Sequence, residues 1–401
     1  MELLIIVVSY DVSRRKDVPN PARAVVVAHA VAHPGRGQCS SALVASGAYG
    51  TAEGASGTAQ YVVYLPQPAG CFNGGVILYA HGYVPVGSPA GTWLSQLELP
   101  DGTNIPALIN ELGYGFAASG YSKDGLAVLQ GIQDTKALVN VLHGLNIPVR
   151  KVFITGASEG GLVAAKSVEA DPSYAGGLAV CGPIGSFPQQ INYLGDARVL
   201  FDYFFPGVLG AGWTASNIAI PAELMTDWTS KYVPAIQNAV NANPLATLQY
   251  LSTSNIAIGL NPSNAAAAIV SALWYNVFAT NDARATLGGN PYDNIGRSYK
   301  GSFNDAKLNA TVARFGADFA ALEQMANYET DGLLSNPLVT LHTTADPEVP
   351  FWQETLYRTE VASRNSLSDL NQIPVLAFGH CNVSATDAEV ALALLLLKAG
   401  F

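Results

Sequence analysis

The sequence predicts an α/β protein with a mostly parallel central sheet flanked by helices, and three observations support this class. Short apolar runs with β-prone character occur at 76–80, 115–119 and 151–155. Fully apolar runs of this length are typical of parallel strands that are covered on both faces. A long amphipathic helix pattern at 125–142 separates the last two runs, as a crossover helix separates parallel strands. Finally, residues 183–336 differ from the rest of the chain because they are rich in helix-forming and aromatic residues and show no sustained strand alternation.

The remaining elements follow from the same reasoning. Further strands are expected at 60–65, 176–180, 338–342 and 373–378, and further helices at 107–112 and 385–399. We therefore divide the chain into a leader or disordered segment (1–38), a catalytic domain made of two parts (39–182 and 337–401), and a helical insertion (183–336). A structureless loop as long as this insertion is implausible. The insertion is expected to form a helical lid between strands six and seven of the sheet.

Composition excludes several classes of protein. The 401 residues carry a net charge of −10 and only 12% are charged, and no basic cluster marks a nucleic-acid surface. The mean hydropathy is +0.22, but the longest apolar runs, Leu3–Val8 and Val390–Leu397, are far shorter than the roughly 20 residues of a spanning helix. We expect no stable membrane span.

The N-terminal region and the cysteines suggest export. Arg23 precedes the run Ala-Val-Val-Val-Ala-His-Ala-Val-Ala, which is typical of a short signal peptide with a small-residue cleavage site. The chain has few Lys and Arg residues and four cysteines. A secreted or periplasmic location is therefore expected.

The sequence Gly156-Ala-Ser158-Glu-Gly160 joins the strand at 151–155 to a helix-compatible segment. A serine between two glycines in a strand–turn–helix setting is held on a sharp turn at the carboxyl end of a sheet, where its hydroxyl is exposed. The alternative is an ordinary glycine-rich turn. Because a serine hydroxyl needs a base and an orienting acid to become a nucleophile, partners elsewhere in the chain decide between the two.

His380 is the best candidate for the base. The histidines of the chain are His29, His33, His81, His143, His342 and His380. The first two lie in the expected leader, His143 ends a helix, and His342 lies inside a strand, where a structural role is favoured. His380 follows an apolar strand and precedes the closing helix, so its loop can place an imidazole over the carboxyl edge of the sheet.

The expected orienting acid is Asp346, which comes just after the strand at 338–342, and Glu348 is its nearest competitor. A tetrahedral oxyanion also needs two preorganised donors. We assign these to the backbone N–H groups of Glu159 and Tyr83. His81 and Gly82 are expected to support the loop that carries Tyr83.

These motifs, in the order Ser158, Asp346, His380, resemble those of the α/β-hydrolases over residues 59–181 and 337–399. The resemblance implies a serine hydrolase without a cofactor, most often an esterase or lipase. His380-Cys381 is also similar to half of a pattern in tannase- and feruloyl-esterase-like hydrolases, where cysteines flank the serine and the histidine. Ala157 stands where that pattern has its other cysteine. No Cys or His spacing resembles a metal site, and no P-loop or dinucleotide fingerprint occurs.

We predict two disulfides, Cys39–Cys71 across the first strands and Cys181–Cys381 at the carboxyl edge of the sheet; four free thiols are the alternative. The expected activity is hydrolysis of carboxylic esters through an acyl-serine intermediate. An insertion rich in aromatic residues predicts neutral esters with apolar or aromatic groups as substrates. The alternatives are a serine peptidase of the prolyl-peptidase type and a non-catalytic binding protein with a hydrolase fold.

Overall fold

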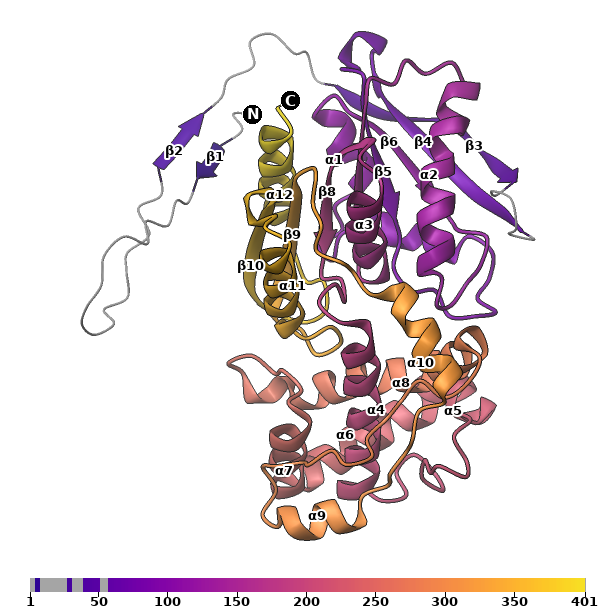
Figure 1. The fold of residues 1–401 in the computed structure, drawn as a ribbon, viewed down its shortest axis with the longest axis vertical. Helices are drawn as coiled ribbons and strands as arrows, with labels where there is room; N and C mark the ends of the chain where they lie inside the picture. The colour runs from indigo at the N-terminus through magenta and orange to yellow at the C-terminus, as the bar shows by residue number, and fades with distance from the viewer. Residues whose placement is uncertain (1–3, 8–26, 31–38, 51–56, 401) are drawn as a thin grey trace.

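The computed structural model describes residues 4–7, 27–30, 39–50 and 57–400 (Figure 1). An eight-stranded sheet runs through it in the spatial order β10-β9-β8-β7-β5-β6-β4-β3. Its strands are β3 (Ser40–Gly50), β4 (Thr58–Gln67), β5 (Gly75–Ala80), β6 (Gly115–Ser119), β7 (Lys151–Ala157), β8 (Tyr174–Val180), β9 (Leu338–Ala345) and β10 (Leu370–Phe378). Strand β4 pairs antiparallel with β3 and β6, and the other pairs are parallel. This mostly parallel sheet, flanked by helices, confirms the predicted fold class.

Strand β5 shows why both faces of the sheet are apolar. Its alternate residues Val76 and Leu78 join one core, and Ile77 and Tyr79 join the core on the opposite face. Successive side chains of a strand point to opposite faces, so a run without polar residues needs helices on both sides. Helices α2 (Val128–Gly144), α3 (Glu159–Ala170) and α11 (Trp352–Ser363) contribute to the first core, and α1 (Ile105–Glu111) and α12 (Ala385–Lys398) to the second.

The two helices of the second face begin at clear N-caps. The side chain of Asn104 accepts a hydrogen bond from the N–H of Ala107 at the start of α1. Helix α12 begins with a capping box formed by Ser384 and Asp387. Such caps satisfy N–H groups that have no partner inside the helix, so both helices have fixed starting points above the sheet.

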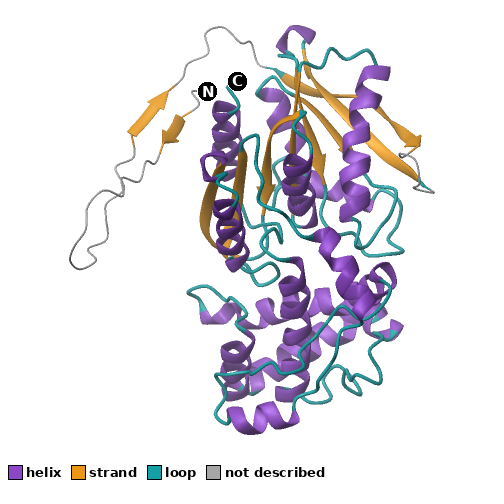
Figure 2. Cartoon of the chain, in the orientation of Figure 1, coloured by secondary structure: helices purple, strands orange, loops and turns teal. Residues whose placement is uncertain are grey.

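The chain between β8 and β9 is helical, and Figure 2 shows it without strands. Its helices are α4 (Phe187–Phe204), α5 (Ala222–Thr226), α6 (Val233–Ala242), α7 (Pro244–Ser254), α8 (Ala265–Leu287), α9 (Asp305–Thr311) and α10 (Phe319–Met325). We call residues 183–336 the helical insertion. It has a core of its own, in which Phe201, Tyr250 and Leu273 are fully buried. Most of its aromatic side chains therefore pack against one another.

The helical insertion is attached to the rest of the molecule by more than its two ends. Ala321 and Met325 of α10 are buried in the same core as α2 and α3. The ring of Phe187, at the start of α4, stacks on Tyr328 with 4.8 Å between centroids. Both rings lie in that same core, so the two ends of the insertion pack together against the sheet side of the molecule.

Both predicted disulfides are present. Cys39 is bonded to Cys71, and Cys181 is bonded to Cys381. Near the N-terminus, β1 (Leu4–Val7) pairs antiparallel with β2 (Val27–Ala30) in a separate two-stranded sheet. Apart from these two strands, the expected leader, 1–38, lies outside the described residues. Among the described helices, none is both long and apolar enough to cross a bilayer.

Candidate active site

Ser158 lies on the turn between β7 and α3 with backbone angles φ 58° and ψ −123°. A non-glycine residue adopts such a conformation only where its surroundings enforce it. A Cβ at Gly156 would lie 2.1 Å from the carbonyl oxygen of Gly160, and one at Gly160 would lie 2.0 Å from that of Ala80. Any side chain at either glycine would therefore force the turn apart. This closely packed turn places Ser158 at the carboxyl end of β7.

The structure brings Ser158, His380 and Asp346 together from three strand ends. The Nε2 atom of His380 lies 2.8 Å from Ser158 Oγ, and its Nδ1 atom lies 2.7 Å from Asp346 Oδ2. Asp346 is fully buried. Its other oxygen, Oδ1, accepts hydrogen bonds from the N–H groups of Glu348 and Val349 at 2.8 and 3.0 Å. These bonds fix the carboxylate so that it faces the imidazole.

His342 has surroundings that fit a structural role. It is fully buried in β9, with Nε2 2.8 Å from the Val349 carbonyl oxygen and Nδ1 3.2 Å from Glu354 Oε1. The first contact ties the strand to the turn that carries Asp346. The Nε2 atom of His342 also lies 3.7 Å from Asp346 Oδ2, so His342 supports the turn that carries Asp346.

Glu348, the competing acid, lies on the other side of the imidazole. Its Oε2 is 3.6 Å from His380 Nε2, and its Oε1 accepts a hydrogen bond from Ser271 of α8. Burial raises the pKa of Glu348 above its ordinary value. Burial alone would lower the pKa of His380, but the charges of Asp346 and Glu348 outweigh it and raise that pKa to about 9. Two carboxylates therefore flank one imidazole.

The loop after β5 is held by a side chain that the sequence analysis did not identify. Gln96 Oε1 accepts a hydrogen bond from Gly82 N at 2.6 Å, and Gln96 Nε2 donates one to the Tyr83 carbonyl at 3.3 Å. The His81 ring is buried and stacks on Tyr121 with 3.9 Å between centroids. Burial lowers the pKa of His81 to about 4, so its ring is neutral.

The two expected oxyanion donors lie beside Ser158. Tyr83 and Ser158 line the same cavities, and Glu159 begins α3. Within the described part of the chain, neither the Tyr83 nor the Glu159 backbone N–H has a hydrogen-bond acceptor. The Glu159 side chain points elsewhere: its buried Oε1 accepts from Ala127 N at 2.6 Å, and burial raises its pKa to about 8.

Tyr275 of α8 is an aromatic residue of the helical insertion that reaches these groups, and the sequence did not distinguish it from the other aromatic residues there. Its ring meets that of His380 edge-on with 6.3 Å between centroids, and its centroid lies 6.1 Å from that of Tyr83. Burial raises the pKa of Tyr275 well above its ordinary value, so the hydroxyl keeps its proton. No motif marks this tyrosine, because its position depends on how α8 packs.

Two cavities meet at Ser158. The larger has a volume of about 460 Å³ and extends along the face of the sheet that α1 and α12 cover. The smaller, about 90 Å³, lies between the start of α3 and helices α4 and α8. Ser158, Tyr83 and Tyr275 line both. The hydroxyl of Ser158 is therefore reached from two apolar spaces.

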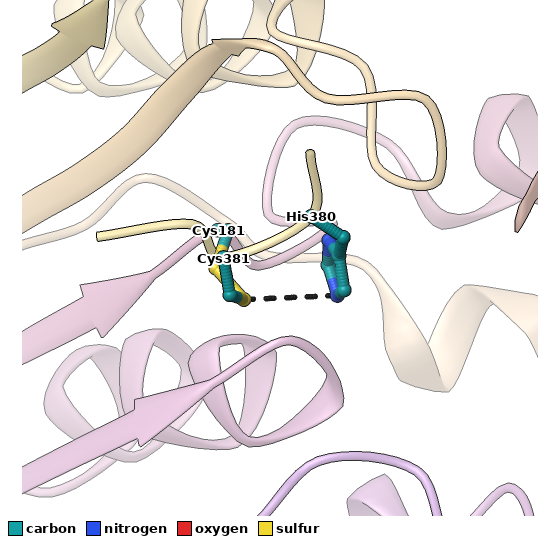
Figure 3. A group of neighbouring side chains, drawn as sticks. All are labelled: Cys181, His380 and Cys381. Atoms are coloured by element: carbon teal, nitrogen blue, oxygen red, sulfur yellow. Dashed lines mark hydrogen bonds between the residues drawn. A yellow bond between two sulfur atoms is a disulfide. The ribbon is translucent and has the colours of Figure 1, made fainter. Parts of the chain in front are cut away.

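A disulfide borders the imidazole (Figure 3). Cys381 Sγ lies 3.7 Å from His380 Nε2, and Cys181 comes from the end of β8. Three side chains of these types within a small volume could suggest a metal site. Both sulfur atoms are in the disulfide, however, so neither is available as a thiolate ligand. The bridge instead fastens the His380 loop to the strand next to β7.

No family model matches the sequence, and no curated protein matches it. Among solved structures, the Pyrococcus horikoshii acylaminoacyl peptidase aligns with a TM-score of 0.44 and 10% identity, over 90% of this chain and 41% of that one. This chain thus spans less than half of that peptidase. The rice cell wall degrading esterase LipA from Xanthomonas oryzae aligns with a TM-score of 0.45 and 17% identity, over 92% and 90% of the two chains. The Pyrococcus furiosus esterase PF2001 gives 0.44 and 12%, over 88% and 90%.

The order of the strands, the glycine-flanked turn after β7 and the positions of Asp346 and His380 after β9 and β10 form one consistent arrangement. The glycine-flanked turn and the positions of Asp346 and His380 after strands were expected from the sequence, and the spatial order of the strands was not. The chain has the α/β-hydrolase fold.

Proposed function

We propose that the protein is a serine hydrolase that cleaves carboxylic esters through an acyl-Ser158 intermediate. The observation that carries this proposal is the unbroken series of short contacts from Asp346 through His380 to Ser158. A serine, a histidine and a buried carboxylate in this geometry form the arrangement that makes a hydroxyl nucleophilic.

In the first step, Ser158 Oγ attacks the ester carbonyl while its proton moves to His380 Nε2. Asp346 holds the imidazole in the required orientation and stabilises the positive charge that forms on it. When the tetrahedral intermediate collapses, the C–O bond to the alcohol breaks and His380 returns the proton to the leaving oxygen. Water then attacks the acyl-enzyme by the same route, which releases the acid and restores Ser158.

The negative oxygen of each tetrahedral intermediate would lie between the N–H groups of Tyr83 and Glu159. Their lack of acceptors within the described residues supports this role, since preorganised donors act most strongly when nothing else competes for them. His81, Gly82 and Gln96 keep the Tyr83 backbone in place. None of these steps requires a cofactor.

The helical insertion would act as a lid over the catalytic edge, with Tyr275 as its contribution to the site. The apolar cavities that meet at Ser158 favour neutral esters with apolar or aromatic groups. The two disulfides are in keeping with a secreted or periplasmic protein.

A peptidase of the prolyl-peptidase type would share the order of the three residues. Among the described residues that line the larger cavity, the only ones that can carry a charge are His380 and Glu98, so it offers little to bind a charged peptide terminus. A non-catalytic binding protein would have no need for the strained turn at Ser158. Ester hydrolysis is therefore the function that the site supports best.

The decisive experiment combines labelling with turnover. A fluorophosphonate should label Ser158 alone, and p-nitrophenyl esters should be hydrolysed faster than prolyl or alanyl p-nitroanilides. Asp346→Asn should be strongly impaired in both assays. Faster hydrolysis of the anilides would support the peptidase, and absence of labelling in the folded protein would support the binding protein.

A further inference from the structure

We propose that helix α8 of the insertion is a fixed part of the catalytic site, and that it acts through two positioning groups, the hydroxyl of Ser271 and the hydroxyl of Tyr83. The first sets the charge beside the base His380, and the second holds the loop of an oxyanion donor. The inference rests on the proposed esterase function and adds to it two hydroxyl groups that act through other groups of the site.

Helix α8 is anchored on two sides. Ala268, Ile269 and Leu273 are fully buried in the core of the insertion. At the C-terminal end of the helix, Ala283 and Leu287 are buried in the core of the catalytic domain, together with residues of α2 and α3. The helix cannot leave the site without exposing these apolar side chains. A rigid element of this kind holds its polar groups more precisely than a loop does.

A second face of α8 meets the carboxyl edge of the sheet. Its positions 271, 275, 278 and 282 are three or four residues apart, which is the spacing of one helix face. The loops that follow β9, β5 and β6 each make a polar contact with this face: Glu348 accepts a hydrogen bond from Ser271, Tyr83 donates one to the Phe278 carbonyl, and the Leu126 N–H donates one to Asp282.

The contact at Ser271 controls the charge beside His380. Ser271 Oγ donates to Glu348 Oε1, and Glu348 Oε2 lies 3.6 Å from His380 Nε2. Burial raises the pKa of Glu348, and the hydrogen bond from Ser271 opposes this rise because it favours the ionised carboxylate. Without this hydroxyl, Glu348 would take up a proton more readily and would stabilise the imidazolium less. The other titratable groups that face this pair are Asp346 after β9, Tyr193 of α4 and Tyr275 of α8.

The contact at Tyr83 holds the oxyanion donor by its side chain. The Tyr83 hydroxyl donates to the Phe278 carbonyl oxygen at 3.2 Å, and the ring centroid lies 6.1 Å from that of Tyr275 and 6.3 Å from that of Trp274. Gln96 holds the main chain of the same residue at its carbonyl oxygen. Tyr83 is thus fixed at both ends, so its N–H keeps one direction. Donors that are oriented in advance need no reorganisation during the reaction.

Ser271→Ala tests the first contact. The midpoint of kcat/KM against pH for a soluble ester should fall by roughly half to one pH unit, because a less negative Glu348 favours neutral His380. Ser271→Thr keeps a hydroxyl and should retain the parent midpoint. In a Glu348→Gln background, Ser271→Ala should cause no further fall, since no charge remains to be changed. Thr280→Ala removes a hydroxyl whose hydrogen bond stays within α8, and it should leave the midpoint unchanged.

Tyr83→Phe tests the second contact. Loss of one hydrogen bond should lower kcat by about three- to tenfold, with KM and the pH midpoint close to those of the parent protein. Tyr250→Phe is the matched control, because it removes the hydrogen bond from a buried tyrosine to the Ala197 carbonyl inside the insertion. It should lower the melting temperature without lowering kcat.

The outcomes separate the two proposals. If Ser158→Ala still hydrolyses the esters, the proposed function itself is wrong. If hydrolysis depends on Ser158, three results would each overturn the role of α8. These are a midpoint in Ser271→Ala that equals or exceeds the parent's, a further fall of the midpoint in the double variant, and a kcat of Tyr83→Phe no lower than that of Tyr250→Phe.

Discussion

Replacing Glu348 with glutamine should move the pH dependence of ester hydrolysis to lower pH. His380 must be neutral to accept the proton of Ser158, and its pKa is raised to about 9 by two neighbouring carboxylates. In the parent protein, kcat/KM should therefore increase with pH up to that range. Removal of one negative charge makes the protonated imidazole less favourable, so the midpoint should fall.

The size of the change follows from the 3.6 Å between Glu348 Oε2 and His380 Nε2. A full charge at this distance contributes about 1 kcal/mol in bulk water and about 5 kcal/mol at an effective dielectric constant near 20. One pH unit corresponds to about 1.4 kcal/mol. Burial raises the pKa of Glu348 itself, which opposes its full ionisation. We expect the midpoint to fall by roughly one to two pH units.

The assay is kcat/KM for a soluble ester between pH 5 and pH 10, corrected for spontaneous hydrolysis. Glu348→Gln should be more active than the parent protein near pH 7, since more of its His380 is neutral there. Glu98→Gln removes an exposed carboxylate at the larger cavity and should leave the midpoint unchanged because solvent screens that charge. An unchanged midpoint in Glu348→Gln, or one displaced to higher pH, would refute the reasoning.

Ser158→Ala and His380→Ala should each reduce ester turnover by a factor on the order of 10⁴ to 10⁶ with an unaltered circular dichroism spectrum. The folded state favours protonated His380, so this residue stabilises the protein below its ordinary pKa of 6.5, and the stabilisation is lost as pH rises through about 9. The melting temperature of His380→Ala should therefore fall further below that of the parent protein at pH 6 than at pH 10. Gln96→Ala should lower kcat by about tenfold or more with little change in KM, because it loosens an oxyanion donor; an effect confined to KM would argue against that role. Replacing both Cys181 and Cys381 with serine should lower the free energy of unfolding by up to about 5 kcal/mol in the chain-entropy model, measured by denaturant titration; equal stability would contradict it.

Features encoded by neighbouring residues could be predicted from the sequence. The turn at Ser158 requires glycine on both sides within five residues, and the strand at β5 is an uninterrupted apolar run. The sequence did not predict strand β3, because its small residues, such as Ala42 and Gly47, have a weak preference for strands. Its long antiparallel pairing with β4 holds it in the sheet. Helix α11 was not anticipated either, since its apolar stripe is narrow.

Some residues of the candidate site could likewise be predicted from the sequence, and others could not. Ser158, Asp346 and His380 follow strands, so chain order indicates where they meet. Gln96 and Tyr275 come from segments whose positions depend on packing over long sequence separations, and no local pattern distinguishes them from other glutamines and tyrosines. The large cavity was not predictable, because an empty space is a property of several elements together.

The bridge between Cys181 and Cys381 spans 200 positions of sequence and encloses the whole helical insertion. In covalent terms, the insertion is part of a closed ring that also contains strands β9 and β10. A protease that cuts one of its surface loops would therefore produce two fragments that remain linked until a reductant is added. The strand end at Val180 and the loop of His380 would stay joined even in such a nicked molecule. Cleavage within the insertion would thus leave the two parts of the central sheet joined.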